Sequence, residues 1–121
     1  MPTSPLSHDQ LVAATVAEMK RQGMTRIYAS HLPGDIQPDP ISGFITDATA
    51  LSGNTLVIVE AESREGLAAS HTQAQWKAFH GHANRVGGHF VAVVNQPDQV
   101  MTQALLHQVC GSAVNAHLWT F

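Results

Sequence analysis

A two-residue turn near the middle of the chain constrains the fold more than any other feature of the sequence. Gly53 and Asn54 form a favoured β-hairpin turn. They separate two segments, 41–51 and 55–62, that we predict to be neighbouring antiparallel strands. The second segment starts with an unbroken apolar run, which is typical of a strand buried on both faces of a sheet. We therefore expect helices on both faces of this sheet.

The same turn determines which residues of the two strands face each other. With a two-residue loop, Ser52 opposes Thr55. Counting outward from this pair places Asp47 directly opposite Glu60. Opposed residues of an antiparallel pair have Cβ atoms about 4.5–5.5 Å apart, so two carboxylates in these positions repel each other. We therefore expect either a cation between them or a proton on one of them.

The remaining segments alternate between helical and strand patterns. Helices are expected where apolar residues recur at helical spacing between capping signals, and strands where apolar and β-branched residues run together. The predicted helices are 7–22, 70–86 and 98–110, and the further strands are 25–32, 90–95 and 117–121. Ser70 and Gln73 have the spacing of a capping box for the second helix. The order α-β-β-β-α-β-α-β predicts an α/β domain with a mixed central sheet flanked by helices.

Composition narrows the class of protein. A chain of 121 residues with 44% apolar residues predicts one domain over residues 1–121. Its single cysteine, Cys110, excludes an intramolecular disulfide and a four-cysteine zinc site. There is no secretory signal pattern and no apolar run of about 20 residues, so we expect a cytoplasmic protein without a membrane partner. Six Lys and Arg against nine Asp and Glu give a net charge of -3, so there is no broad basic surface to hold nucleic acid nonspecifically, although nucleic acid stays a possible partner. Composition does not exclude a homo-oligomer.

Three acidic residues are predicted to gather at the end of the buried strand. Because side chains alternate along a strand, Glu62 shares the face of Glu60 and joins the pair that Glu60 forms with Asp47. An oxygen-rich group of this kind suits a hard divalent cation such as Mg²⁺ or Mn²⁺. The alternative is that the strand emerges into solvent at Glu60 and that the acids are ordinary surface charges.

The order of these segments and their acids resembles the PD-(D/E)xK, or restriction-endonuclease-like, superfamily. The resemblance is carried by the runs FITDA, VIVEAE, HTQAQW and FVAVV, and it extends from the first helix to the fourth strand. It implies that Asp47 and Glu60 bind a metal ion that activates water against a phosphodiester, and that Glu18 matches an acid of the first helix. Thr46 stands where the family has Pro, and Glu62 stands where it has the catalytic Lys.

Other residues compete for the roles that the family assigns. The dipeptide Pro38-Asp39 spells part of the motif, but it lies in a loop between prolines and we assign it no role. In the superfamily the lysine sometimes lies on the following helix, where Gln73 and Lys77 share one side. Lys77 either points back at the acids or extends into solvent beside Trp76.

Two functions from different classes follow from these patterns. The first is a metal-dependent phosphodiesterase acting on nucleic acid, with Asp47 and Glu60 as Mg²⁺ ligands and Glu62 as a further ligand or water-orienting group. In this function Gln73 or Lys77 contacts the attacked phosphate. The second is a catalytically degenerate module of the same fold with a binding or accessory role, which the Lys-to-Glu difference and the acidic net charge favour. A general α/β domain whose resemblance is accidental is a third interpretation.

Overall fold

The computed structural model describes residues 5–30, 32, 34, 36–111 and 115–121. Its strands form one mixed sheet with helices on both faces. Along the chain the elements are α1 His8–Arg21, β1 Thr25–Ala29, β2 Ala48–Ser52, β3 Thr55–Ala61, α2 Arg64–Leu67, α3 Ser70–Val86, β4 His89–Val94, the 3-10 turn η1 Gln96–Asp98, α4 Gln99–Cys110 and β5 Ala116–Thr120. The sheet has five strands in the order β1-β2-β3-β4-β5. The first three strands run antiparallel, whereas β3, β4 and β5 are parallel. The predicted α/β class with a mixed sheet is confirmed.

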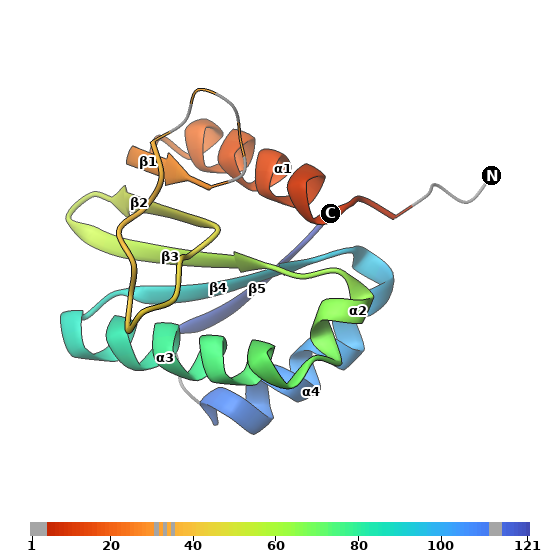
Figure 1. The fold of residues 1–121 in the computed structure, drawn as a ribbon. Helices are drawn as coiled ribbons and strands as arrows, with labels where there is room; N and C mark the ends of the chain where they lie inside the picture. The colour runs from red at the N-terminus through yellow and green to blue at the C-terminus, as the bar shows by residue number, and fades with distance from the viewer. Residues whose placement is uncertain (1–4, 31, 33, 35, 112–114) are drawn as a thin grey trace.

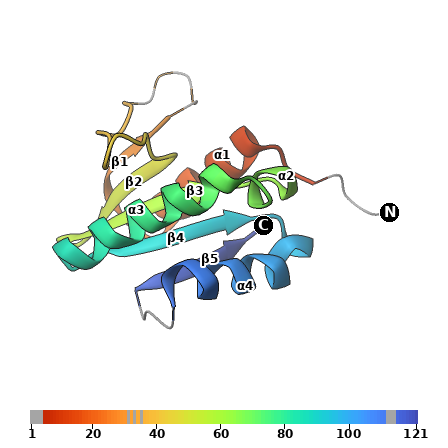
Figure 2. The same cartoon turned by 60° about the horizontal axis from the view of Figure 1, so that its bottom comes forward.

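The helices form two layers around the sheet. Figure 1 shows α1 on one face and α3 and α4 on the other, and Figure 2 shows α3 and α4 side by side across the second face. Two separate cores result, because alternate residues of β3 point to opposite layers: Val57 and Val59 pack on the side of α1, and Ile58 packs on the side of α3. The strand is buried on both faces, as its apolar run predicts.

The central hairpin has the predicted register. Ser52 pairs with Thr55 and Ala48 pairs with Val59, and the turn begins at Gly53, whose φ of 62° is a conformation that glycine adopts at little cost. The predicted start of the first hairpin strand at residue 41 is wrong, because β2 begins only at Ala48.

A tight turn explains the late start of β2. Ile41 and Phe44 pair with each other across Ser42 and Gly43, which both have positive φ, 52° and 82°. Such a turn reverses the chain within four residues, so this segment cannot run alongside β1 or β3.

The two long helices around the acidic end of the sheet begin in different ways. The side chain of Ser7 accepts a hydrogen bond from the Gln10 N–H, and the Gln10 side chain bonds back to Ser7, so α1 starts with a complete capping box. The predicted capping box at Ser70 and Gln73 is wrong: Ser70 is already helical, and Ala69 is the N-cap without a side-chain bond. A short helix that sequence patterns did not predict, α2, precedes this cap and leads directly into α3.

The C-terminal third agrees with the prediction to within one or two residues. Helix α4 follows the 3-10 turn η1, and β5 closes the sheet as an edge strand paired with β4. The longest helix, α3, has 17 residues. Within the described ranges, no helix combines the length and the apolar character needed to cross a membrane.

Candidate functional site

Asp47 and Glu60 lie together at the carboxyl end of β3. Since Ala48 pairs with Val59, Asp47 falls opposite Glu60, one residue before β2 begins. The backbone N–H of Asp47 donates to Oε2 of Glu60 at 3.4 Å, and Oδ2 of Asp47 accepts from the Ala61 N–H at 2.8 Å. The two acidic residues are only 3% and 5% exposed. They are therefore part of the interior and not ordinary surface charges.

Glu62 completes a group of three acids that we call the acidic cluster: Asp47, Glu60 and Glu62. Its N–H donates to the Val93 carbonyl at 2.9 Å, which continues the line of β3 past the last paired residue. A Cβ atom placed on Gly66 would lie 2.0 Å from Oε2 of Glu62, so the carboxylate lies directly over this glycine of α2. Glu62 is 8% exposed, and its position depends on a helix that has room for it only because residue 66 is glycine.

A histidine that sequence reasoning did not identify contacts the acidic cluster. Nε2 of His8, at the start of α1, lies 2.9 Å from Oδ1 of Asp47, and Nδ1 lies 3.0 Å from Oδ1 of Asp9. The hydrogen bond to Asp47 is the main reason that the pKa of His8 rises to about 9, against the opposing effect of partial burial. His8 is thus an imidazolium at neutral pH and balances the charge of Asp47.

The cluster also holds protons. Burial, followed by the charges of Asp47 and Glu62, raises the pKa of Glu60 well above its usual value. Burial and the charge of Asp47 raise the pKa of Glu62 to about 7, although nearby His8 partly opposes this. The repulsion expected from the hairpin register is therefore relieved in both of the expected ways, by a cation and by protonation.

The donor chemistry of the cluster suits Mg²⁺ or Mn²⁺, because all three side chains offer carboxylate oxygens. As these residues now lie, Oδ1 of Asp47 is bonded to His8 and Oδ2 to a backbone N–H. Across the part of the chain that the structure describes, no three His, Cys, Asp or Glu side chains are grouped so as to hold a metal ion. Loading a metal would thus require His8 to release Asp47 and Glu60 to lose its proton.

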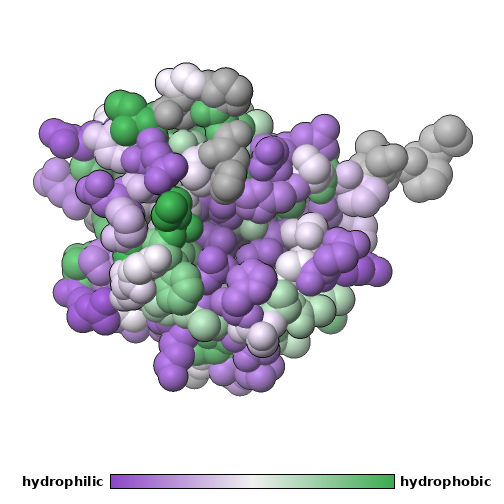
Figure 3. All heavy atoms as spheres, viewed as in Figure 1, coloured by the Kyte–Doolittle hydropathy of each residue, from purple (hydrophilic) through white to green (hydrophobic). Residues whose placement is uncertain are grey.

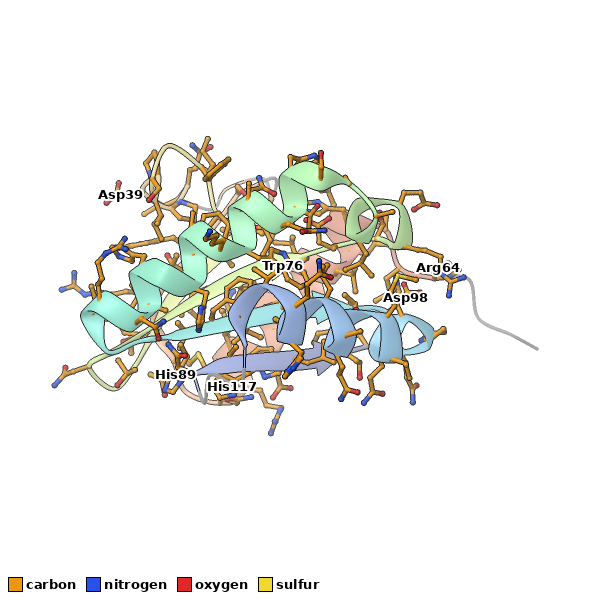
Figure 4. The ribbon with its side chains drawn as sticks, turned by 90° about the horizontal axis from the view of Figure 1, so that it is seen from below. Asp39, Arg64, Trp76, His89, Asp98 and His117 are labelled. Atoms are coloured by element: carbon orange, nitrogen blue, oxygen red, sulfur yellow. The ribbon has the colours of Figure 1, made fainter. Side chains whose placement is uncertain are left out.

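Four residues from the sequence analysis lie outside the cluster. Gln73 and Lys77 are exposed, whereas the neighbouring Thr72 on α3 is buried. Glu18 pairs with Arg21, with Nε of the arginine 2.9 Å from Oε1, and it lies about 15 Å along α1 from the end that carries His8. The Arg21 and Gln22 hydrogen bonds lower the pKa of Glu18 to about 2. Asp39 is exposed in its loop (Figure 4).

A second polar group lies at the other end of the parallel strands. Nδ1 of His89, the first residue of β4, is 2.9 Å from Nε2 of His117 on β5. The pair borders a cavity of about 190 Å³ lined by Met24, Val57 and Trp119, among others. Figure 4 shows the two histidines at the end of the molecule opposite to Arg64, which follows β3. This group is separate from the acidic cluster.

The acidic cluster therefore lies at the start of β2 and the end of β3, with His8 of α1 bonded to Asp47 and Gly66 of α2 against Glu62. In Figure 3 hydrophilic residues dominate the surface between α1 and α2 on the face shown. The chain matches no protein-family model, no curated protein and no solved structure.

Proposed function

We propose that this protein is a metal-dependent phosphodiesterase that acts on nucleic acid. The observation that carries the proposal is the convergence of three buried carboxylates, Asp47, Glu60 and Glu62, at the carboxyl end of one buried strand. Grouping like charges in the interior lowers the stability of a fold, and perturbed groups of this kind are concentrated at functional sites.

The topology supports the restriction-endonuclease-like assignment that the sequence resemblance suggests. Asp47 lies just before the second strand, Glu60 lies in the third strand and Glu62 just after it, and a helical crossover follows the third strand of the mixed sheet. We assign Asp47 and Glu60 as the ligands of Mg²⁺ or Mn²⁺, and Glu62 as a further ligand or as the group that orients the attacking water. A bound ion would neutralise charge on the attacked phosphate and lower the pKa of water.

We assign the proton transfer and the charge balance of the reaction to Glu62 and His8. We assign Glu62 to accept the proton of a water molecule whose oxygen attacks phosphorus, while the bond to the leaving oxygen breaks and that oxygen takes a proton from solvent. His8 carries positive charge at neutral pH at the edge of the cluster, with 35% of its side chain exposed. We assign His8 the charge-balancing role in place of Lys77, which is exposed on α3.

A catalytically degenerate module is the second candidate. It is favoured by the contact between His8 and Asp47, because an internal imidazolium already occupies an oxygen that a metal ligand needs. In this function the chain keeps the fold and the acids but binds a partner without cleaving it.

Cleavage assays separate the two candidates. Labelled single-stranded and duplex DNA and RNA, together with bis(p-nitrophenyl) phosphate, are incubated with wild type in Mg²⁺, in Mn²⁺ and in EDTA. The phosphodiesterase function predicts cleavage only with metal, and loss of cleavage in Asp47→Asn and Glu60→Gln. Asp39→Asn is the matched control, since it removes an exposed acid outside the cluster.

Thermal unfolding of the same proteins shows whether metal binds. A ligand that binds only the folded state raises its stability by mass action, so Mn²⁺ should raise the Tm of wild type and of Asp39→Asn but not of Asp47→Asn. Metal binding without cleavage of any substrate would favour the degenerate module. No metal response and no cleavage would overturn the proposed function.

A further inference from the structure

A large cavity lies beside the acidic cluster. It has a volume of about 950 Å³, near the upper end of the ~300–1,000 Å³ range of small-molecule sites. Its lining comes from the segment before α1 and from the residues that follow β3, β4 and β5. The cavity therefore lies at the carboxyl ends of the parallel strands, where ligands of open α/β sheets commonly bind.

The cavity is lined by residues that are adjacent in sequence to two residues at the acidic cluster. Ser7 and Ser63 line the cavity, and their sequence neighbours are His8 and Glu62. Asn95, which directly follows β4, holds the segment before α1 in place: its Oδ1 accepts from the Leu6 N–H at 2.8 Å and its Nδ2 donates to the Leu6 carbonyl at 2.9 Å. One wall of the cavity is thus tied to the strand end by a buried side chain.

Arg64 gives the cavity a positioned cation. Its Nε lies 2.8 Å from Oδ1 of Asp98, which is 4% exposed, while the arginine side chain remains 63% exposed (Figure 4). The buried carboxylate thus orients the guanidinium without removing it from solvent. Arginine held in this way presents planar N–H donors that match a phosphate group.

Phe121 gives the cavity an aromatic surface. The carbonyl of Phe121 accepts from the Gln96 N–H at 3.0 Å, and its N–H donates to the Val94 carbonyl at 3.2 Å. The backbone is therefore held at the end of the sheet while the residue stays 39% exposed. An exposed ring on a held backbone is suited to stacking against an unpaired base.

We infer that this cavity binds an unpaired nucleoside next to the attacked phosphodiester, with Arg64 on a phosphate and Phe121 against the base. The inference rests on the proposed function and names its substrate class: dinucleotides and single-stranded oligonucleotides. Long duplexes are disfavoured, since the chain has six Lys and Arg against nine Asp and Glu. Duplex binding takes many phosphate contacts at once, whereas a cavity with one arginine recognises a single nucleotide.

Binding is measured by fluorescence anisotropy in EDTA, so that the result does not depend on a metal ion. The probe is a labelled ten-nucleotide single strand, and the competitors are a dinucleotide and a blunt duplex. We expect the dinucleotide to displace the probe and the duplex to compete about tenfold less well per nucleotide. Arg64→Gln and Phe121→Ser should each weaken probe binding about tenfold. Arg85→Gln, which removes an exposed arginine at the far end of α3, should bind like wild type.

Circular dichroism shows whether each variant is folded. If Arg64→Gln does not fold, Phe121→Ser still tests the inference. Unchanged binding in the folded variants, or competition by the duplex as strong as that of the single strand, would overturn the inference. Metal-dependent cleavage of bis(p-nitrophenyl) phosphate, which has no nucleoside, would leave the proposed function standing in that case. Binding that depends on Arg64 without cleavage of any diester would instead overturn the proposed function and support the inference that the cavity binds nucleotides.

Discussion

Replacing Glu62 by glutamine should stabilise the metal-free protein at pH 8 but not at pH 4. The folded-state pKa of Glu62 is about 7, raised from 4.5 by burial and by the charge of Asp47. Between these two values the folded state holds a proton that the unfolded chain has lost, so stability falls as pH rises from 4.5 to 7. Glutamine has nearly the same shape as the protonated acid and does not titrate, so the variant does not lose this stability as pH rises.

The size of the effect follows from the shift. One pKa unit corresponds to about 1.4 kcal/mol, so a rise from 4.5 to about 7 costs wild type about 3 kcal/mol above pH 7. For a chain of 121 residues this is equivalent to roughly 10 °C in Tm. At pH 4 both states of wild type hold the proton, and the variant should differ little from it.

Chemical and thermal unfolding in EDTA at pH 4 and pH 8 measures this difference directly. Glu65→Gln is the control, because Glu65 is an exposed acid on α2 close to Glu62 in sequence, and its effect should be small at both pH values. An equal effect of Glu62→Gln at pH 4 and pH 8 would refute the reasoning, since it would mean that burial and Asp47 do not hold a proton on this carboxyl.

Three further predictions test the neighbours of the cluster. Gly66→Ala places a Cβ 2.0 Å from Oε2 of Glu62, so it should displace that carboxylate, cost about 1 kcal/mol of stability in unfolding experiments and weaken Mn²⁺ binding in a calorimetric titration. His8→Gln should destabilise the protein by about 1 kcal/mol at pH 6, a value reduced for its partial exposure. Because the folded-state pKa of His8 is about 9, against 6.5 unfolded, this effect should fade as pH rises through 9 in a series of denaturant melts. Lys77→Ala should change neither stability, by more than about 0.5 kcal/mol, nor the rate of metal-dependent cleavage, and a loss of cleavage would restore the lysine to the site.

Much of the fold follows from local patterns. The turn at Gly53 predicts the hairpin register. The apolar and β-branched residues that recur at helical spacing in the first helix form its buried face: Leu11, Val12, Thr15, Val16 and Met19. Gly87 directly follows the predicted helix 70–86 and ends α3 with a positive φ of 69°. These features depend on residues close together in the chain, so the sequence carries them directly.

The features that were missed depend on distant or competing contacts. His8 meets Asp47 across 39 positions of sequence, and no periodicity marks such a pair. The missed helix α2 has only four residues and is specified by the cap of Ser63. The predicted capping box at Ser70 failed because the chain is already turning there, with the Thr72 hydroxyl donating to the Gly66 carbonyl at 2.6 Å. The roles of Asp47, Glu60 and Glu62 in catalysis stay predictions.

A calorimetric titration of Mn²⁺ into the protein at pH 7 tests the central claim most directly. It is run in two buffers of different ionisation enthalpy, which reveals protons released on binding. We predict saturable binding to wild type with release of protons, because Glu60 must give up its proton and His8 must leave Asp47 before the carboxylates can bind the ion. Asp47→Asn should abolish the binding, and Asp39→Asn should not. The absence of saturable binding to wild type, or binding without proton release, would contradict the account.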